Sequence, residues 1–207
     1  MRRIGLLGGS FNPAHRGHRR MSLAAMDALG LDELWWLVSP GNPLKARAGM
    51  APFAARLASA REMARGTRIR VSDIETRLHT RFTVDTVTAI VRRHPADRFI
   101  WLMGADTVAE FHQWKQWQRL ARTVPIAIMS RPGYGQAARA ARAMGWLRWF
   151  VHPAATARRW TNWSAPAISL LRLPPDPTSA TRLRALDPDW HRRFTAVRAP
   201  HARLEKN

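Results

Sequence analysis

The chain has 207 residues, which suits one α/β domain with at most a small appendage. A hydrophobic share of 46% is enough for a packed core and argues against wholesale disorder. Cysteine is absent, which excludes disulfides and cysteine-based zinc sites and favours an intracellular setting. No run approaches the roughly 18 apolar residues of a membrane span, and the apolar start is too short for a signal peptide. We therefore expect a cytoplasmic protein without a membrane partner.

The net charge is +20, from 34 basic and 14 acidic residues. This surplus fits either a polyanionic partner, such as nucleic acid or a phosphorylated substrate, or a general bias toward arginine. The basic residues are spread along the chain and form no block of the kind that marks a nucleic-acid arm. We favour the bias, so nucleic acid is the less favoured partner, and a homo-oligomer is left open.

Short apolar runs alternate with segments of helical periodicity in the first half of the chain. Strands are predicted at residues 3–7, 34–38, 69–71 and 99–103. Helices are predicted at 17–29, which Gly30 is suited to end, at 53–65, with Pro52 in the first turn, and at 83–93. Glycines follow three of these strands, at Gly8-Gly9, Gly41 and Gly104.

The second half continues the alternation less regularly, above all between residues 134 and 166. Short helices are predicted at 105–111 and 114–121, a strand at 126–129 and a helix at 136–144. Late strands are predicted at 146–150 and 168–173, and late helices at 179–186 and 190–197. Alternating strands and helices predict an α/β fold with a parallel sheet and right-handed crossovers. Ligands of such sheets bind at the carboxyl ends of the strands.

The stretch from residue 8 to residue 18 has the chemistry of an anion site and reads GGSFNPAHRGH. Gly8 and Gly9 let the backbone approach a ligand closely, and free N–H groups at a helix start attract anions. His15 and His18 would share one face of a helical turn and point at the same anion. No Gly-Lys-Ser/Thr follows, which excludes a Walker A loop. The residues alone leave open a surface turn or half of a metal site.

This stretch strongly resembles the signature of the adenylyltransferase superfamily with the HxGH motif. The whole chain resembles its bacterial nicotinate-mononucleotide adenylyltransferases, through segments 40–45, 82–86, 104–106, 111–114, 131–133 and 178–184. The resemblance implies a Rossmann-like, doubly wound parallel sheet of the nucleotidyltransferase type. It implies a single domain over residues 1–207, with a small C-terminal helical portion at about 176–207.

The resemblance also implies a reaction: nicotinate mononucleotide and ATP give nicotinate adenine dinucleotide and pyrophosphate, in NAD biosynthesis. His18 and His15 would be the catalytic residues, as phosphate stabilisers, because the attacking phosphate is already an anion. The implied ATP-binding residues are Gly8, Gly9, Ser10, Phe11, His15, His18, Lys45, Gly104, Asp106, Arg131, Ser179, Thr181 and Arg184. The implied mononucleotide-binding residues are Phe82, Thr83, Thr86, Trp114 and Lys115. Mg²⁺ would arrive with ATP, without a protein metal cage.

Three positions depart from the family's pattern. Phe82 replaces a tyrosine, so any hydroxyl contact to substrate is lost there. Arg81 stands where a small polar residue is common, and Ala180 replaces the second serine of the late motif. These departures affect fine substrate contacts more than the reaction type.

Simpler roles are open for several of these residues. Asp106 could cap a helix, Trp114 could pack in the core, Lys45 and Arg131 could be solvated, and Arg184 could lie on an outer helix face. For the whole protein, the alternatives are nicotinamide-mononucleotide and pantetheine-phosphate adenylyltransferases. From another class, an RNA-binding protein could use the positive charge and the tryptophans.

Overall fold

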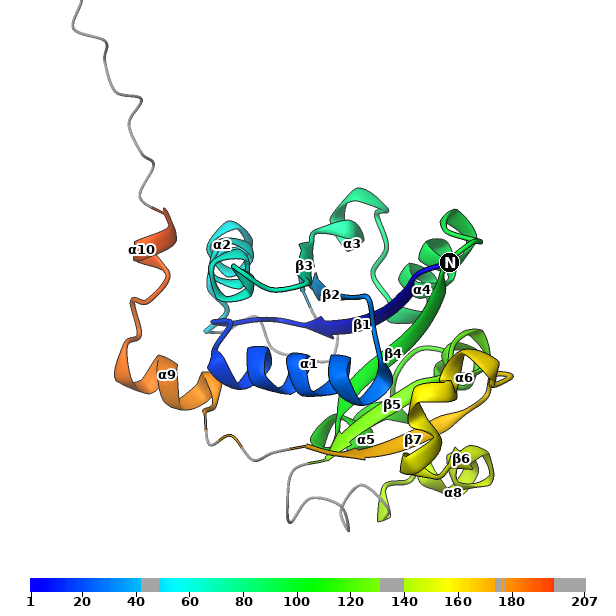
Figure 1. Cartoon of the computed structure of the whole chain (residues 1–207). Coiled ribbons are helices and arrows are strands. Elements are labelled where there is room, and N and C mark those ends of the chain that lie inside the picture. Colours follow the sequence, from blue (N-terminus) through cyan, green and yellow to red (C-terminus); the bar gives the residue numbers. More distant parts are fainter. Residues whose placement is uncertain (42–48, 131–139, 174–175, 177, 196–207) are drawn as a thin grey trace, which may run out of the picture.

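The structure is a computed structural model that describes residues 1–41, 49–130, 140–173, 176 and 178–195. Within these residues, seven strands form one sheet in the order β3-β2-β1-β4-β5-β7-β6 (Figure 1). The strands are β1 (Arg3–Gly9), β2 (Glu33–Val38), β3 (Ile69–Ser72), β4 (Arg98–Gly104), β5 (Ile126–Ser130), β6 (Val151–His152) and β7 (Ile168–Arg172). Every pairing between them is parallel, which confirms the predicted parallel α/β sheet.

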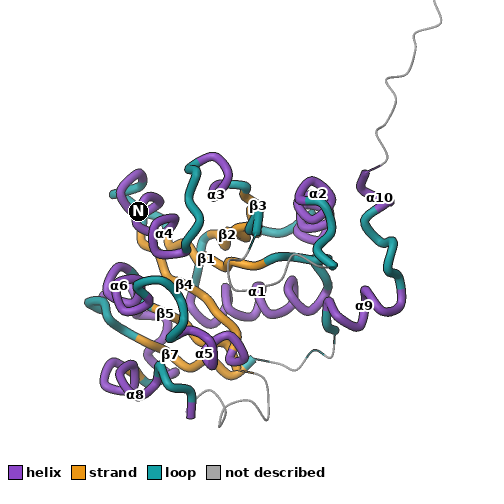
Figure 2. Tube along the Cα trace, turned by 180° about the vertical axis from the view of Figure 1, so that it is seen from behind, coloured by secondary structure: helices purple, strands orange, loops and turns teal. Residues whose placement is uncertain are grey.

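Helices cover both faces of this sheet, so the fold is doubly wound (Figures 1 and 2). One face packs against α1 (Arg16–Leu29), α2 (Phe53–Ala64) and the 3-10 helix η2 (Ala154–Asn162). The other packs against α4 (Thr83–Arg93), α5 (Ala105–Phe111), α6 (Trp117–Thr123) and α8 (Met144–Leu147). Short elements α3 (Ile74–Arg77), η1 (Arg148–Phe150), α9 (Ala180–Leu186) and α10 (Arg192–Thr195) complete the described chain.

The order of the strands reverses direction between β1 and β4. From β1 the chain moves outward through β2 and β3, and then returns to add β4 on the other side. The connections that leave β1 and β4 therefore diverge at their carboxyl ends, which opens a crevice there. This crevice is the position at which open α/β sheets bind ligands.

Local sequence signals explain several helix boundaries. Helix α1 ends at Gly30, whose φ of 61° is the left-handed conformation that glycine adopts without steric cost. Helix α9 begins after Ser179, whose side chain accepts a hydrogen bond of 3.2 Å from the N–H of Arg182. Most predicted elements are present with ends shifted by a few residues; the helix predicted from residue 114 begins at Trp117.

The strand predicted at residues 146–150 is wrong, because this segment is helical and forms α8 and η1. Trp146 and Phe150 lie with ring centroids 4.8 Å apart, a contact that suits the i, i+4 spacing of a helix. The short strand follows directly, as β6. Helices α3 and η2 were not predicted from the sequence. Parts of the predicted segments 136–144 and 190–197 lie outside the described residues.

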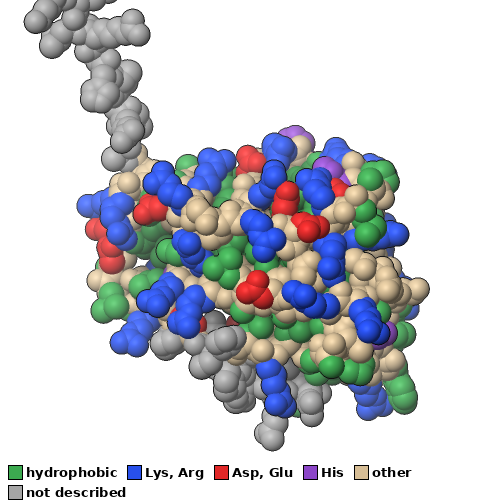
Figure 3. Space-filling view, in the orientation of Figure 1, with side chains coloured by type: hydrophobic (Ala, Val, Ile, Leu, Met, Phe, Trp, Pro, Cys, Tyr) green, Lys and Arg blue, Asp and Glu red, His purple; other side chains and the backbone are tan. Residues whose placement is uncertain are grey.

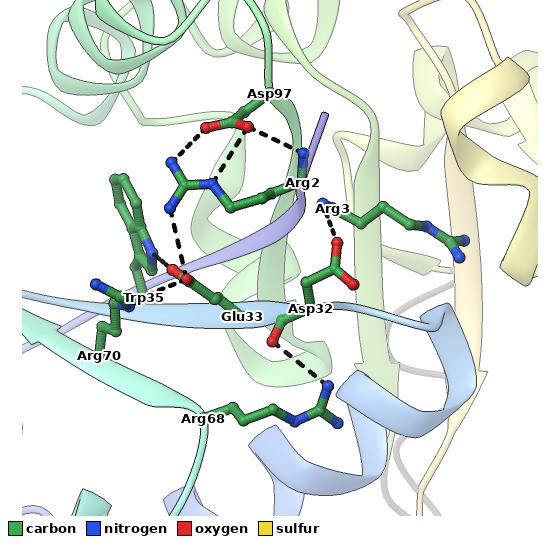
Figure 4. A network of polar contacts seen from close by, with 8 residues as sticks. All are labelled: Arg2, Arg3, Asp32, Glu33, Trp35, Arg68, Arg70 and Asp97. Carbon is green, nitrogen blue, oxygen red and sulfur yellow. Dashed lines mark hydrogen bonds and ion pairs between the residues drawn. The ribbon is translucent and has the colours of Figure 1, made fainter.

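Ion pairs join the amino-terminal ends of four strands, β1, β2, β3 and β4 (Figure 4). Arg2 binds Asp97 at 2.6 Å and Glu33 at 3.5 Å, and Arg70 binds Glu33 at 2.8 Å. The Arg2 side chain and N–H, both hydrogen-bonded to Asp97, hold the pKa of that carboxyl below its usual value. These contacts lie at the opposite end of the strands from the crevice.

Basic side chains are spread over the face shown in Figure 3 and outnumber acidic ones. This distribution agrees with the absence of a basic block in the sequence. In the described part of the chain, no helix is both long and apolar enough to cross a membrane.

Candidate active site

A cleft of about 830 Å³ lies at the carboxyl ends of β1 and β4. Its described lining includes the end of β1 with the following loop, the β4–α5 junction, and residues near 82, 114 and 180. The cleft brings together most of the predicted site residues, namely Gly8, Gly9, Ser10, Phe11, His15, His18, Phe82, Thr83, Gly104, Asp106, Trp114, Lys115, Ser179, Thr181 and Arg184. Lys45 and Arg131 lie outside the described residues.

His15 and His18 cap the start of helix α1 reciprocally. The His15 N–H donates to Nδ1 of His18 at 3.3 Å, and the His15 side chain accepts from the N–H of His18. His15 is thus the N-cap residue, in extended backbone with φ −148° and ψ 169°, and not part of the helical turn as its spacing suggested. The two rings still meet, with centroids 3.8 Å apart. Because Nδ1 of His18 accepts, a neutral ring keeps its proton on Nε2, as a donor.

Gly17 permits a close approach between the start of α1 and the segment that precedes α9. A Cβ at this position would lie 3.0 Å from Cε1 and Nδ1 of His15 and 3.2 Å from the carbonyl oxygen of Thr178. Any side chain here would therefore push on the histidine pair and on the segment that leads into α9. The glycine of the HxGH motif is explained by this crowding.

Gly8 and Gly9 are the last residues of β1, not the start of the following turn. A Cβ on Gly8 would lie 2.7 Å from Cη2 of Trp101 in β4, and one on Gly9 would lie 3.1 Å from the ring of Phe11. Gly8 thus makes room for the indole of Trp101 beside the cleft. Both glycines therefore leave room for aromatic rings of the protein, in addition to any close approach by a ligand.

The turn at Phe11 is held by two arginines. Phe11 has a φ of 47°, a left-handed conformation that is costly for a bulky residue. The carbonyl oxygen before it, on Ser10, accepts from Arg56 at 2.7 Å, and the one after it, on Asn12, accepts from Arg184 at 2.6 Å. The Phe11 ring is buried, stacked 4.9 Å from Trp36.

The opposite wall of the cleft carries aromatic and cationic groups. Trp114 is half-buried and meets Phe111 edge-on at 5.4 Å and Trp101 at 6.2 Å. The ammonium of Lys115 lies 4.2 Å from the ring centroid of Phe82, and Arg81 lies 5.8 Å from the same ring. A flat ring with two cations beside it can accept a planar, negatively charged group.

Thr86 does not line the cleft, unlike the other residues predicted for the mononucleotide. It is buried beneath the start of α4, where its hydroxyl bonds to Thr80 Oγ1 at 2.7 Å and donates to the carbonyl oxygen of Phe82 at 3.3 Å. Thr86 therefore holds the backbone of Phe82 in place through its hydroxyl group and does not face the cleft.

Asp106 lies in the first turn of α5, two residues after Gly104. The N-cap of this helix is Gly104, and no side-chain cap bond is present, so Asp106 does not act as a capping residue. Its carboxylate folds back over position 104, where a Cβ would collide with Oδ1. A carboxylate so placed in the cleft can accept hydrogen bonds from a ligand's hydroxyl or amino groups.

Glu75 is a cleft residue that the sequence analysis missed. Its carboxyl is buried in α3 and bonds to the side chain of Ser39, which follows β2. Burial raises the pKa of Glu75 to about 7, although the Ser39 hydrogen bond opposes the rise. A lone glutamate in a short, unpredicted helix has no sequence signal that could have identified it. The described residues contain no cluster of three or more His, Cys, Asp or Glu suited to a metal.

Comparisons with known proteins identify the family. Residues 6–185 match the model of the cytidylyltransferase-like family. A protein of Erythrobacter litoralis described as a probable nicotinate-nucleotide adenylyltransferase is 57% identical over 192 residues, which cover 93% of this chain and 88% of the relative. The chain belongs to the nicotinate-nucleotide adenylyltransferase family. A second member of the family, from Parvibaculum lavamentivorans, is 51% identical over 88% of this chain and 90% of its own.

Solved structures confirm the nucleotidyltransferase type of fold. The chain is similar to nicotinic acid mononucleotide adenylyltransferase of Plasmodium falciparum complexed with NaAD, with a TM-score of 0.63 and 16% identity over 89% of this chain and 83% of that one. The same enzyme complexed with APC aligns with a TM-score of 0.62. At 16% identity the likeness concerns the fold alone.

Proposed function

We propose that this chain transfers the adenylyl group of ATP to nicotinate mononucleotide, which forms nicotinate adenine dinucleotide and pyrophosphate. The observation that carries the proposal is one cleft with two unlike walls. The capped start of α1 and the start of α9 supply donors for phosphates, and the Trp114–Phe82 wall supplies flat apolar surface beside cations. At about 830 Å³, the cleft is at the upper end of the usual range for small-molecule sites.

The reaction is an in-line displacement at the α-phosphorus of ATP. A phosphate oxygen of the mononucleotide forms the new P–O bond, and the bond to the β-phosphate oxygen breaks, so pyrophosphate leaves with the electron pair. The nucleophile is an anion at neutral pH, since the second pKa of a phosphate monoester is near 6. No general base is required, and the protein's task is to position two anions and stabilise the charge between them.

We assign the phosphate contacts to the first wall. Nε2 of His18 donates to the α-phosphate in the transition state, and the N–H groups of Ser10 and Phe11 lie nearby. His15, Ser179, Thr181 and Arg184 hold the other phosphates, with Lys45 and Arg131 as further predicted contacts. Gly8 and Gly9 allow the close approach, and Gly104 and Asp106 contact the adenosine.

Mg²⁺ is expected to enter with ATP. The described carboxyl groups that line the cleft are Asp106 and Glu75, which form no cluster suited to a dedicated ion. This donor set fits an ion held mainly by phosphate oxygens and water. When bound, the ion would neutralise phosphate charge, while His18 and Arg184 orient the phosphates.

The second wall is proposed to select the acid form of the pyridine. We assign the Trp114 ring to stacking on the pyridine, and the N–H groups at Phe82, Thr83 and Lys115 to the carboxylate. Arg81 and Lys115, both within 6 Å of the Phe82 ring, add positive charge. This charge attracts the carboxylate of the acid form but not the neutral carboxamide of the amide form. Thr86 contributes by supporting the Phe82 carbonyl.

We further propose that residues 1–207 form one domain. Helix α9 lines the cleft, and α10 contacts α2, so the C-terminal helices pack on the same unit as the sheet. This arrangement supports the C-terminal helical portion as part of the active site and not a separate module.

The test is a pyrophosphate-release assay with ATP and each candidate co-substrate. We expect rapid release with nicotinate mononucleotide, slower release with nicotinamide mononucleotide and none with pantetheine phosphate. A preference for either of the last two would contradict the proposal. Tight RNA binding with a steep salt dependence in a filter assay, without pyrophosphate release, would favour the RNA-binding alternative.

A further inference from the structure

Arg56 is a buried arginine that lies behind the cleft without lining it. Its side chain projects from α2, only 1% of the residue is exposed, and it is not among the cleft residues. It donates to four carbonyl oxygens: from Nη1 to Ser10 and Ser39, each at 2.7 Å, from Nε to Ala51 at 3.0 Å and from Nη2 to Pro40 at 3.2 Å. One guanidinium thus ties together the loop after β1, the loop after β2 and the approach to α2.

Burying the charge of Arg56 costs free energy, and the stability of the fold does not by itself explain why a cation stands here. Desolvation lowers the pKa of Arg56, yet an arginine remains charged at any physiological pH. None of the ion pairs among the described residues involves Arg56, so its compensation comes from carbonyl dipoles and from the Phe53 ring, whose centroid lies 5.4 Å from its Cζ. Replacing a buried charged group by apolar side chains of similar volume often leaves a protein equally stable or makes it more stable. A specific demand for this cation at this place is therefore indicated.

The role of Arg56 follows from the orientation of the peptide that joins Ser10 to Phe11. This peptide is trans, so its C=O and N–H point in opposite directions. Arg56 holds the C=O on its own side, which directs the N–H of Phe11 away from Arg56. Both Ser10 and Phe11 line the cleft, on the side that Arg56 does not occupy. The bond from Arg56 therefore sets the direction of an amide at the phosphate-binding turn.

The turn needs such a hold because of Phe11. Its φ of 47° costs about 1–3 kcal/mol, and a peptide in that state relaxes unless its surroundings fix it. Arg184 fixes the carbonyl after Phe11 and lines the cleft itself. Arg56 fixes the carbonyl before Phe11 and lies outside the cleft. Of the two arginines, Arg56 is therefore the one that holds the turn from outside the cleft, where ligand cannot displace it.

We propose that Arg56 is a positioning residue for adenylyl transfer, which fixes the Ser10 carbonyl so that the Phe11 N–H faces the phosphates of ATP. The same guanidinium places its positive charge behind the anion site and holds the loop after β2 through Ser39 and Pro40. This inference rests on the proposed function, because it assigns the turn to ATP. It adds a residue that touches neither substrate and acts through the backbone.

The test compares Arg56→Met and Arg56→Lys with Leu147→Ala, a control that opens a cavity under α8, far from the loops. Leu147 is fully buried, so its truncation destabilises the fold without touching the turn. Urea unfolding and near-UV circular dichroism give the folded fraction of each variant at low temperature. Kinetics are then expressed per folded molecule.

We expect Arg56→Met to lower kcat/KM for ATP about 100-fold, the effect of losing an oriented donor at a developing charge. The KM for the mononucleotide should change at least tenfold less than that for ATP. Arg56→Lys, with the charge but fewer reachable carbonyls, should fall between Arg56→Met and the wild type. Per folded molecule, Arg56→Met activity equal to that of Leu147→Ala would overturn the inference, as would equal losses for both substrates.

Two further measurements keep the inference separate from the proposed function. If Arg56→Met does not fold, Arg56→Lys decides alone: kcat/KM for ATP equal to the wild type overturns the inference, and a loss of tenfold or more supports it. Calorimetric titration with Mg·ATP needs no turnover. A wild type that binds ATP but releases no pyrophosphate would sink the proposed function, while weaker ATP binding by the Arg56 variants would still support the inference.

Discussion

Nη1 of Arg184 donates a hydrogen bond of 2.6 Å to the carbonyl oxygen of Asn12, 172 residues earlier in the chain. The same guanidinium donates from Nη2 to Thr181 Oγ1 at 3.3 Å, within its own helix α9. Helix α9 is therefore fastened to the phosphate-binding turn before ATP is present. An arginine held in place in this way loses little side-chain entropy when it binds a phosphate.

Arg184→Ala should raise the KM for ATP about tenfold to 100-fold, because a hydrogen bond to a charged group is worth about 1.5–3 kcal/mol. Arg182→Ala is the matched control. It removes the same charge from the same helix, but Arg182 is exposed and does not line the cleft. Steady-state kinetics with varied ATP separate the two, and equal KM values for both variants would contradict the assignment.

His18→Ala should lower turnover about 100-fold to 1000-fold, as expected for a donor to the transition-state charge. Stability should fall by only about 1 kcal/mol, because the lost contact is a helix-cap hydrogen bond. Pyrophosphate release and urea unfolding measure the two effects. His191→Ala, next to α10 and outside the cleft, should retain full turnover. A well-folded His18→Ala protein with near wild-type turnover would exclude the mechanism.

Trp114→Ala should weaken mononucleotide binding about tenfold, within the range for loss of a stacked base, and change ATP binding less than twofold. Trp117→Ala provides the contrast. Trp117 packs on Phe111 and Trp146, each at 5.5 Å, but does not line the cleft, so its loss should cost stability without selectivity. Calorimetric titrations with each substrate distinguish the two, and a purely structural Trp114 would behave like Trp117.

Glu75 should make the free energy of unfolding fall as pH rises. In the folded protein its pKa is raised from 4.5 to about 7, so between these values the folded state binds more protons than the unfolded chain. Stability is then lost across this window, by about 3 kcal/mol at most. Urea unfolding of the wild type and Glu75→Gln at about pH 5 and about pH 8 tests this. The Gln variant should show the smaller drop, and parallel pH profiles would refute the assignment.

Local patterns in the sequence predict much of this fold. Strands β1, β2, β4, β5 and β7 are short apolar runs because both of their faces are covered by helices. The end of α1 is visible because Gly30 must adopt a positive φ. Most cleft residues near the first turn could be predicted because the glycines and histidines suited to anion binding lie together within residues 8–18.

Other features depend on contacts between distant segments, which no local pattern contains. Arg56 appears as one more arginine on a helix, since the four carbonyls that surround it come from three separate segments. Residues 146–150 read as a strand because a helix packed by Trp146 and Phe150 has the same composition as a buried strand. Thr86 matched a binding motif, but its hydroxyl is already used by Thr80 and Phe82.

The two ends of the sheet are secured by different chemistry, so they should respond differently to ionic strength. At the end near Arg2, partly exposed ion pairs with Glu33 and Asp97 are open to counterions and weaken as salt is added. At the cleft end, Arg56 is shielded from solvent and is bound to neutral carbonyls, which salt barely affects. Fraying in concentrated salt would therefore begin at the amino-terminal edge, and the catalytic turn would be among the last parts to loosen.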